Sequence, residues 1–124
     1  TFYHGHTFAG NPIAAAASLA TLAVYAEEGI VAQAARNGRQ LGQWVECLRG
    51  HPLVRDVRAL GMIAVVELHP APGLAKRIQD DLRAGGILLR PLGDVIYLMP
   101  PLITPAAVLE EAIGALQAAL DRQR

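Results

Sequence analysis

Helical periodicity dominates the first fifty residues. Asn11 followed by Pro12 is typical of a helix start, because an asparagine side chain caps the first amides and a proline at the first position loses no hydrogen bond. The alanine-rich stretch that follows predicts a helix ending near Glu28, packed closely on most sides. A second run of apolar residues at helical spacing, with a glycine directly after it, predicts a helix over Ile30–Arg49.

The middle of the chain changes to strand-like patterns. Val54–Leu60 alternates between apolar and polar residues, and Gly61 separates it from the continuous β-branched run Met62–Leu68, which is typical of a buried strand. Two shorter apolar runs, Ile87–Leu89 and Val95–Met99, predict two further strands joined by a turn. The pattern therefore predicts four strands.

Two more helices complete the predicted fold. Apolar residues spaced four apart predict a short helix that begins at Leu74 and ends at a pair of glycines. Thr104 is the expected cap of a last helix that Pro105 opens. The resulting order predicts an α+β fold, with a small, mostly antiparallel sheet that helices cover on one face. The length of 124 residues predicts one domain over residues 1–124.

Composition and charge exclude several classes of partner. The 11 basic and 11 acidic residues give zero formal net charge and form no basic block, so we expect no nucleic-acid partner. No apolar run has the length of a membrane span, so we expect no membrane partner. The single cysteine, Cys47, allows no intrachain disulfide and favours a reducing, cytoplasmic location; its helical neighbourhood predicts a packed thiol.

The first residue and the apolar content both suggest that this chain is part of a longer protein. The sequence begins with Thr1 and runs directly into a glycine-bearing loop, which we interpret as a start inside a longer protein, although removal of a leader produces the same result. Hydrophobic residues make up 52% of the chain, an excess that suits a domain docked against another one.

The first segment with candidate chemistry precedes the first helix. His4, Gly5, His6 and Thr7 lie just before a helix start, where backbone amides and the helix dipole favour an anion such as phosphate. A threonine that bonds its own backbone in a loop explains the same pattern. The two histidines alternate on an extended segment and no third ligand follows at suitable spacing, so we expect no metal site.

The second candidate is an arginine at the end of an apolar run. Arg90 precedes Pro91, and a guanidinium held there is suited to binding a ligand carboxylate with two hydrogen bonds. A surface arginine, or one paired with Asp94, is the alternative interpretation. The only lysine, Lys76, lies on the polar side of the short helix, and we expect it to be a solvated surface residue. We therefore expect no catalytic residue within this chain.

Three segments together resemble the C-terminal part of class III aminotransferases, which depend on pyridoxal 5'-phosphate. They are the run from His4 to Pro12 with the alanine-rich helix behind it, the run Val57–Ile63, and the Pro100–Leu102 run that ends a strand. Within the class, the run Leu89–Pro101 most resembles the branch that takes an amino group from S-adenosylmethionine in biotin biosynthesis. The resemblance covers nearly the whole chain.

The resemblance implies a role for each candidate residue. It implies that Thr7 binds the cofactor phosphate across the interface of a homodimer, that His6 contributes to this contact, and that Gly5 lies against the substrate. It implies that Arg90 holds the carboxylate of the keto acid. Many relatives carry proline or serine at the position of His6.

The resemblance also implies what the chain lacks. Residues 1–11 are expected to be the cofactor-phosphate loop that leads from a large domain, and that domain, which holds the catalytic lysine, lies outside this sequence. The chain alone is then inactive, and its partners are small-molecule substrates, its own large domain and a second subunit. Two alternatives remain open: a free-standing regulatory module that binds a carboxylate, and a dimerisation domain.

Overall fold

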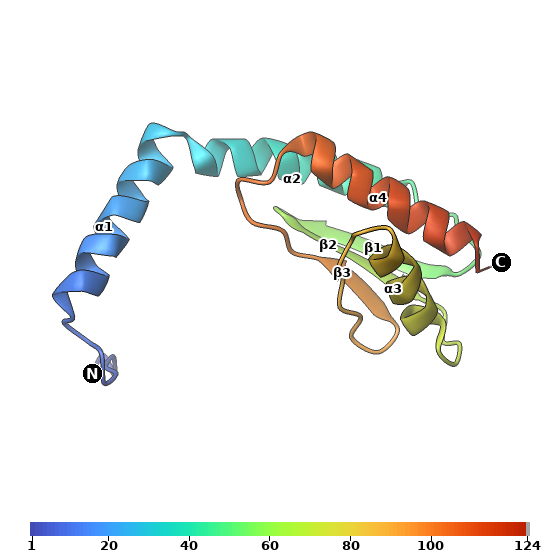
Figure 1. The fold of residues 1–124 in the computed structure, drawn as a ribbon, viewed down its shortest axis with the longest axis horizontal. Coiled ribbons are helices and arrows are strands. Elements are labelled where there is room, and N and C mark those ends of the chain that lie inside the picture. The colour runs from blue at the N-terminus through green and yellow to red at the C-terminus, as the bar shows by residue number, and fades with distance from the viewer. Residues whose placement is uncertain (124) are drawn as a thin grey trace. The chain divides into compact units, whose positions relative to one another are not determined.

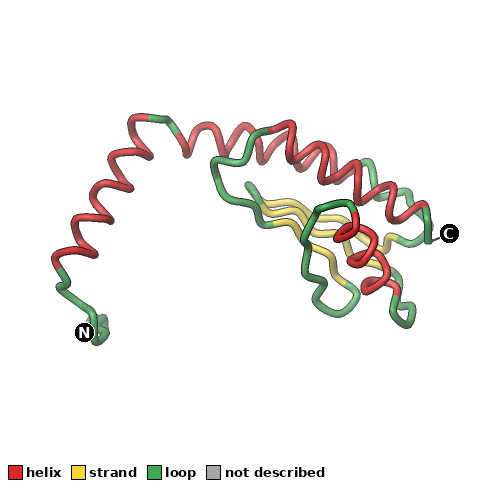
Figure 2. The backbone as a smooth tube through the Cα atoms, viewed as in Figure 1, coloured by secondary structure: helices red, strands yellow, loops and turns green. Residues whose placement is uncertain are grey.

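The computed structural model describes residues 1–123; Arg124, the last residue of the predicted domain, lies outside them. The chain forms two compact units, Thr1–Val31 and a larger one from Ala32 onward. The described elements follow the order α1, α2, β1, β2, α3, β3, α4 (Figures 1 and 2). This α+β composition confirms the predicted fold class.

The first unit consists of the N-terminal segment and helix α1, Pro12–Glu27. The side chain of Asn11 accepts hydrogen bonds from the amides of Ile13 and Ala14, which confirms the predicted helix start. Gly29 follows the helix with a φ of 60°. None of the α1 side chains is buried within the described residues, so the close packing expected from the alanines is absent from this chain.

Helix α2, Ile30–Glu46, ends three residues earlier than predicted. The amides of Cys47, Leu48 and Arg49 each donate to the carbonyl three residues back, so the chain leaves the helix through a tighter turn. This turn also exposes Cys47, and the prediction of a packed thiol is wrong.

Three antiparallel strands form the sheet in the order β1–β2–β3: Val54–Leu60, Ile63–Leu68 and Val95–Leu98. Val57, Val66 and Ile96 lie opposite one another and are buried, whereas Arg58, Val65 and Tyr97 form the neighbouring row. The alternation places one face of the sheet in the core. Figure 1 shows α2 and α4 lying over the sheet.

The predicted fourth strand, Ile87–Leu89, does not form. The Ile87 amide donates to the Leu82 carbonyl at the end of α3, Leu74–Ala84, and the Leu89 carbonyl accepts from the side chain of Gln79. Two of the backbone groups that a strand would offer to a neighbour are therefore bonded to α3. An isolated bridge between Leu92 and Val95 joins this region to β3.

Helix α4, Ala106–Asp121, begins one residue later than predicted. Pro105 occupies the cap position and its carbonyl accepts from the amides of Val108 and Leu109, whereas no side chain caps the helix. The prediction that Thr104 is the cap is therefore wrong. The Thr104 carbonyl instead accepts a hydrogen bond of 3.0 Å from the buried side chain of Asn37 on α2.

The core of the second unit joins the sheet to three helices. Its fully buried large side chains come from α2, α3, α4 and the strands: Leu41, Val45, Val57, Leu68, Leu74, Ile78, Leu82, Ile96, Leu109, Leu116 and Leu120. The ends of α3 and α4 are also linked, because Arg122 and Gln123 donate to Asp81. In the part of the chain that is described, no single helix has the length and hydropathy of a membrane span. Helices α1 and α2 reach that length and hydropathy only when they are counted together.

Candidate functional site

The two predicted anion-binding segments belong to different units. Thr7 lies in the first unit, in a turn directly before α1, and Arg90 lies in the second, between α3 and β3. Each segment is therefore described on its own.

The turn before α1 leaves several hydrogen-bond donors available. The amides of Ile13 and Ala14 are taken by the Asn11 side chain, and the Ala15 amide donates to the Asn11 carbonyl. Within residues 1–123, the Thr7 hydroxyl and the Thr7 and Phe8 amides donate to no protein acceptor. The expected anion contact through the first turn of α1 is thus blocked by Asn11, and the donors at Thr7 remain.

Two backbone hydrogen bonds shape this turn. The Ala9 amide donates to the His6 carbonyl at 2.9 Å, and the Asn11 amide donates to the Phe8 carbonyl at 3.2 Å. Gly10, with a φ of 78°, adopts the left-handed conformation that glycine tolerates best. His6 therefore contributes its carbonyl to the turn, which a different side chain at this position would preserve.

His4, Gly5 and His6 lie exposed on the segment that leads into the turn. The rings of His4 and His6 approach edge to face, with centroids 6.3 Å apart. No group of three histidine, cysteine, aspartate or glutamate side chains suited to a metal ion occurs among the described residues.

The donor set at Thr7 fits a phosphate group. A hydroxyl and two neighbouring amides are all donors, which a phosphate dianion can accept, and no carboxylate lies in the sequence from His4 to Asn11 to repel it. Thr7 and Phe8 are exposed, so a ligand can reach them from solvent. These residues can hold the phosphate end of a cofactor.

Arg90 lines a groove of about 430 Å³ in the second unit. The other walls come from the segment before Arg90, the edge and exit of β3, and the first half of α4: Leu88, Leu89, Tyr97, Leu98, Met99, Pro100, Pro101, Thr104, Val108, Leu109 and Ala112. Among the described residues, Arg90 is the one charged side chain in this lining. Such a groove suits a ligand with an apolar body and one carboxylate.

The Arg90 guanidinium is available for a ligand. Its side chain is exposed, and among the described residues it forms neither an ion pair nor a hydrogen bond, so the alternative pairing with Asp94 does not occur. The Asp94 carbonyl instead accepts from the Leu68 amide. An unpaired guanidinium can bind a carboxylate through two parallel hydrogen bonds.

Lys76 differs from Thr7 and Arg90 because its charge already has a partner. It is on the outer side of α3, with 64% of its side chain exposed, and it pairs with Asp80 one turn along the helix. Salt bridges of this kind on a helix surface contribute little to stability. The prediction that Lys76 is a solvated surface residue is confirmed.

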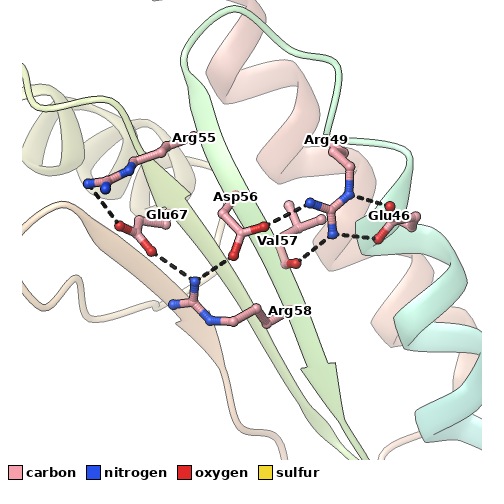
Figure 3. Close-up of polar contacts among 7 residues, drawn as sticks. All are labelled: Glu46, Arg49, Arg55, Asp56, Val57, Arg58 and Glu67. Atoms are coloured by element: carbon pink, nitrogen blue, oxygen red, sulfur yellow. Dashed lines mark hydrogen bonds and ion pairs between the residues drawn. The ribbon is translucent and has the colours of Figure 1, made fainter.

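The largest cluster of charged side chains among the described residues is an ion-pair network on β1, β2 and the end of α2 (Figure 3). Arg49 pairs with Glu46, donates to Asp56 at 2.8 Å and donates to the Val57 carbonyl. Arg58 joins Asp56 to Glu67 across the strands, at 2.7 and 2.8 Å. All its acids are paired with arginines, so the network connects α2 to the sheet and holds no group poised for catalysis.

The network also shifts the pKa values of its side chains. The hydrogen bond from Arg49 lowers the pKa of the Glu46 carboxyl. The hydrogen bonds from Arg49 and then Arg58 lower the pKa of the Asp56 carboxyl. The hydrogen bond to Glu67 raises the pKa of the Arg58 guanidinium. Each shift favours the charged form, as expected for groups that bond opposite charges.

Sequence patterns did not reveal the groove around Arg90. Tyr97 was predicted within a strand, and Val108 within a helix, but their position beside Arg90 depends on how β3 and α4 pack. Gln79 and Asn37, which bond the backbone of two of the walls, were also missed. A polar residue within a helix carries no signal for which carbonyl it reaches.

The chain belongs to the class-III aminotransferase family, which it matches over residues 1–120. Enzymes of this class depend on pyridoxal 5'-phosphate. This confirms the resemblance at the level of the class and the cofactor of that class.

Two named relatives illustrate the similarity. The acetylornithine aminotransferase of Mycobacterium tuberculosis is 44% identical over 120 residues, which are 96% of this chain and 29% of the relative. The adenosylmethionine-8-amino-7-oxononanoate aminotransferase of Nitratidesulfovibrio vulgaris is 34% identical over 130 residues, which are 97% of this chain and 24% of the relative. The chain thus spans less than a third of the length of these relatives.

A solved structure agrees. The crystal structure of adenosylmethionine-8-amino-7-oxononanoate aminotransferase from Methanocaldococcus jannaschii superposes with a TM-score of 0.86 and 30% sequence identity, covering 98% of this chain and 30% of that one. The fold described above is therefore found in class III enzymes.

Proposed function

We propose that this chain is the C-terminal part of a pyridoxal-phosphate-dependent aminotransferase. In this proposal residues 1–124 are the small domain, and residues 1–11 are the loop that reaches the cofactor phosphate. The large domain and the catalytic lysine lie in the remainder of the enzyme, and the chain alone does not transaminate. The match to the class over residues 1–120 supports this proposal.

The chain's own residues then have binding and orienting roles. The Thr7 hydroxyl and its neighbouring amides hold the cofactor phosphate in the active site of the second subunit of a homodimer, with His6 contributing to the contact. Gly5 lies against the substrate. Pyridoxal phosphate supplies the electron sink for amino transfer when bound.

Arg90 orients the amino acceptor. Its guanidinium binds the carboxylate of a keto acid, and the apolar walls of the groove exclude water around the rest of that substrate. The observation that carries this role is a guanidinium that, within residues 1–123, has no partner and is the single charge in the groove. Fixing one end of the acceptor restricts the position of its carbonyl carbon.

We further propose that the acceptor is 8-amino-7-oxononanoate and the donor is S-adenosylmethionine, as in biotin biosynthesis. The segment Leu89–Pro101 supports this assignment, and so do relatives with that printed activity at 34% identity. The 44% identity to acetylornithine aminotransferase favours a second candidate, in which acetylornithine is the donor.

One pair of assays separates the two candidates. The full-length enzyme is incubated with S-adenosylmethionine and 8-amino-7-oxononanoate, or with acetylornithine and a small keto acid, and the aminated product is quantified. Preference for the first pair supports the biotin assignment. A specificity constant at least tenfold higher for the acetylornithine pair would replace it.

A variant tests the role of Arg90 in either reaction. A hydrogen bond to a charged group is worth about 1.5–3 kcal/mol, so Arg90→Ala is expected to lower kcat/KM for the keto acid by about tenfold or more. Arg39→Ala, at an exposed arginine of α2, is the matched control and leaves kcat/KM unchanged. Unchanged kcat/KM in Arg90→Ala would remove Arg90 from the site.

A further inference from the structure

The backbone next to Arg90 receives little support from regular structure. Residues 87–91 belong to no strand or helix. At one end the Ile87 amide donates to Leu82 at 2.9 Å, and at the other Leu92 and Val95 exchange hydrogen bonds of 2.8 and 3.1 Å. Between these two anchors the arginine has no sheet partner to hold its backbone.

One side chain holds this stretch at its centre. Gln79 Nε2, on α3, donates a hydrogen bond of 2.9 Å to the carbonyl oxygen of Leu89, the residue directly before Arg90. Gln79 is half-buried, and the Leu89 side chain packs against the core. The peptide between Leu89 and Arg90 is therefore held by a glutamine amide, and the Leu89 side chain next to it is held by apolar packing.

Holding a carbonyl also limits the arginine that follows it. The Leu89 carbonyl and the Arg90 amide share one rigid peptide plane. A hydrogen bond to that oxygen therefore also fixes the position of the Arg90 Cα atom at the other end of the plane. Pro91 restricts the conformation of Arg90 from the other side, because a residue before proline is confined largely to extended conformations. The Cα–Cβ bond of Arg90 then points in a narrow range of directions, which limits the part of the groove that the guanidinium can reach.

We propose that Gln79 is a positioning residue for carboxylate binding: its amide fixes the Leu89–Arg90 peptide and so aims the Arg90 guanidinium into the groove. Gln79 is absent from the groove lining and does not reach the ligand itself. The proposal rests on the proposed carboxylate-binding role of Arg90 and adds the residue that prepares that role.

The test compares Gln79→Met with Gln79→Glu in the full-length enzyme. Methionine keeps the length and helix propensity of glutamine but cannot donate. An ionised glutamate cannot donate either, and its oxygens repel the Leu89 carbonyl. Gln43→Met, at an exposed glutamine of α2, is the matched control.

Three measurements are made on each variant. They are KM and kcat for the keto acid, the same constants for its methyl ester, which lacks the carboxylate charge, and the rate of amide hydrogen exchange across residues 88–90. Loss of one neutral hydrogen bond corresponds to about a two- to tenfold change in an equilibrium constant. Both Gln79 variants are expected to raise KM for the keto acid by that factor. We expect kcat for the keto acid and both constants for the ester to stay unchanged. The amide hydrogens of residues 88–90 should exchange faster.

The outcomes separate this inference from the proposed function. If Arg90→Ala raises KM for the keto acid and the Gln79 variants do not, the positioning role is wrong and the function of Arg90 stands. If Arg90→Ala has no effect, the carboxylate role fails and the positioning role fails with it. A loss shared equally by the keto acid and its ester would mean that Gln79 supports only the fold, which also overturns the proposal.

Discussion

Gly38 of α2 lies directly against Gly61, in the turn between β1 and β2. A Cβ atom at Gly38 would lie 2.6 Å from both the carbonyl carbon and the carbonyl oxygen of Gly61. One turn further along α2, a Cβ at Gly42 would lie 3.5 Å from the Cβ of Ala59. Gly38 therefore allows α2 to cross the β1–β2 hairpin at backbone contact distance, whereas an alanine at position 42 would make only an ordinary van der Waals contact.

This contact predicts a large effect of one methyl group. Gly38→Ala is expected to destabilise the chain by about 1–3 kcal/mol, because the obstructing atoms belong to the backbone and cannot rotate away. Gly114→Ala is the matched control: it is also a helix glycine, nothing lies within 4 Å of its added Cβ, and alanine there should stabilise by about 0.5–1 kcal/mol. Urea unfolding measures both; equal midpoints would contradict the close approach.

The ion-pair network predicts how stability depends on pH. The Asp56 carboxyl has a lowered pKa in the folded chain because it bonds Arg49 and Arg58. A lowered folded pKa adds stability that is present above the unfolded value, about 4, and is lost as pH falls through the folded value. As the pH is lowered from about 5 to below the folded pKa of Asp56, the urea midpoint should therefore decrease less for Asp56→Asn than for the unaltered chain.

Salt and a second carboxylate provide the controls for this pH effect. Glu110 is an exposed acid of α4 without an arginine partner among the described residues, and Glu110→Gln should retain the original pH dependence. High salt should reduce the contribution of Asp56, because its partners are half exposed. Identical acid profiles for Asp56→Asn and the unaltered chain would show that the network does not act through Asp56.

The turn at Thr7 predicts a specific loss of cofactor affinity. If its hydroxyl holds the cofactor phosphate, Thr7→Ala in the full-length enzyme should weaken pyridoxal phosphate binding by about tenfold or more, since a hydrogen bond to a charged group is worth about 1.5–3 kcal/mol. Thr7→Ser keeps the hydroxyl and should retain most of the affinity. Titration of the cofactor-free enzyme, followed by absorbance, measures this.

Thr21 offers a control within the same unit. Its hydroxyl already donates to the Ala17 carbonyl inside α1, so Thr21→Ala should leave the cofactor affinity unchanged. An affinity for pyridoxal phosphate that is equal in Thr7→Ala and Thr21→Ala would exclude the phosphate contact.

Strong local signals were sufficient to predict most elements. The Asn11–Pro12 pair predicted the start of α1, and alternation predicted β1 over Val54–Leu60 with the bounds that the structure has. The apolar run Ile87–Leu89 had the composition of a strand, yet its backbone bonds α3. A strand requires a partner strand, and composition carries no information on whether that partner is present.

The candidate site also has a part that could be predicted from local sequence and a part that could not. The sequence singled out Thr7 and Arg90 from their local settings, a turn before a helix and the end of an apolar run. The Asn11 cap was predicted and is confirmed, and it takes the amides of Ile13 and Ala14 that an anion at the helix start would need. The sequence could not show the groove, whose walls come from segments separated by up to 24 residues, Leu88 to Ala112.

By itself the sequence determined the composition of the fold and the ends of several elements, and it singled out two candidates for anion binding, because caps, glycines and periodic apolar residues act over a few neighbouring positions. Only the tertiary structure decided which backbone groups those elements bond: Gly38 against Gly61, and Gln79 to Leu89 beside the arginine. Such contacts join residues distant in the chain, and they are set by close packing of the whole core.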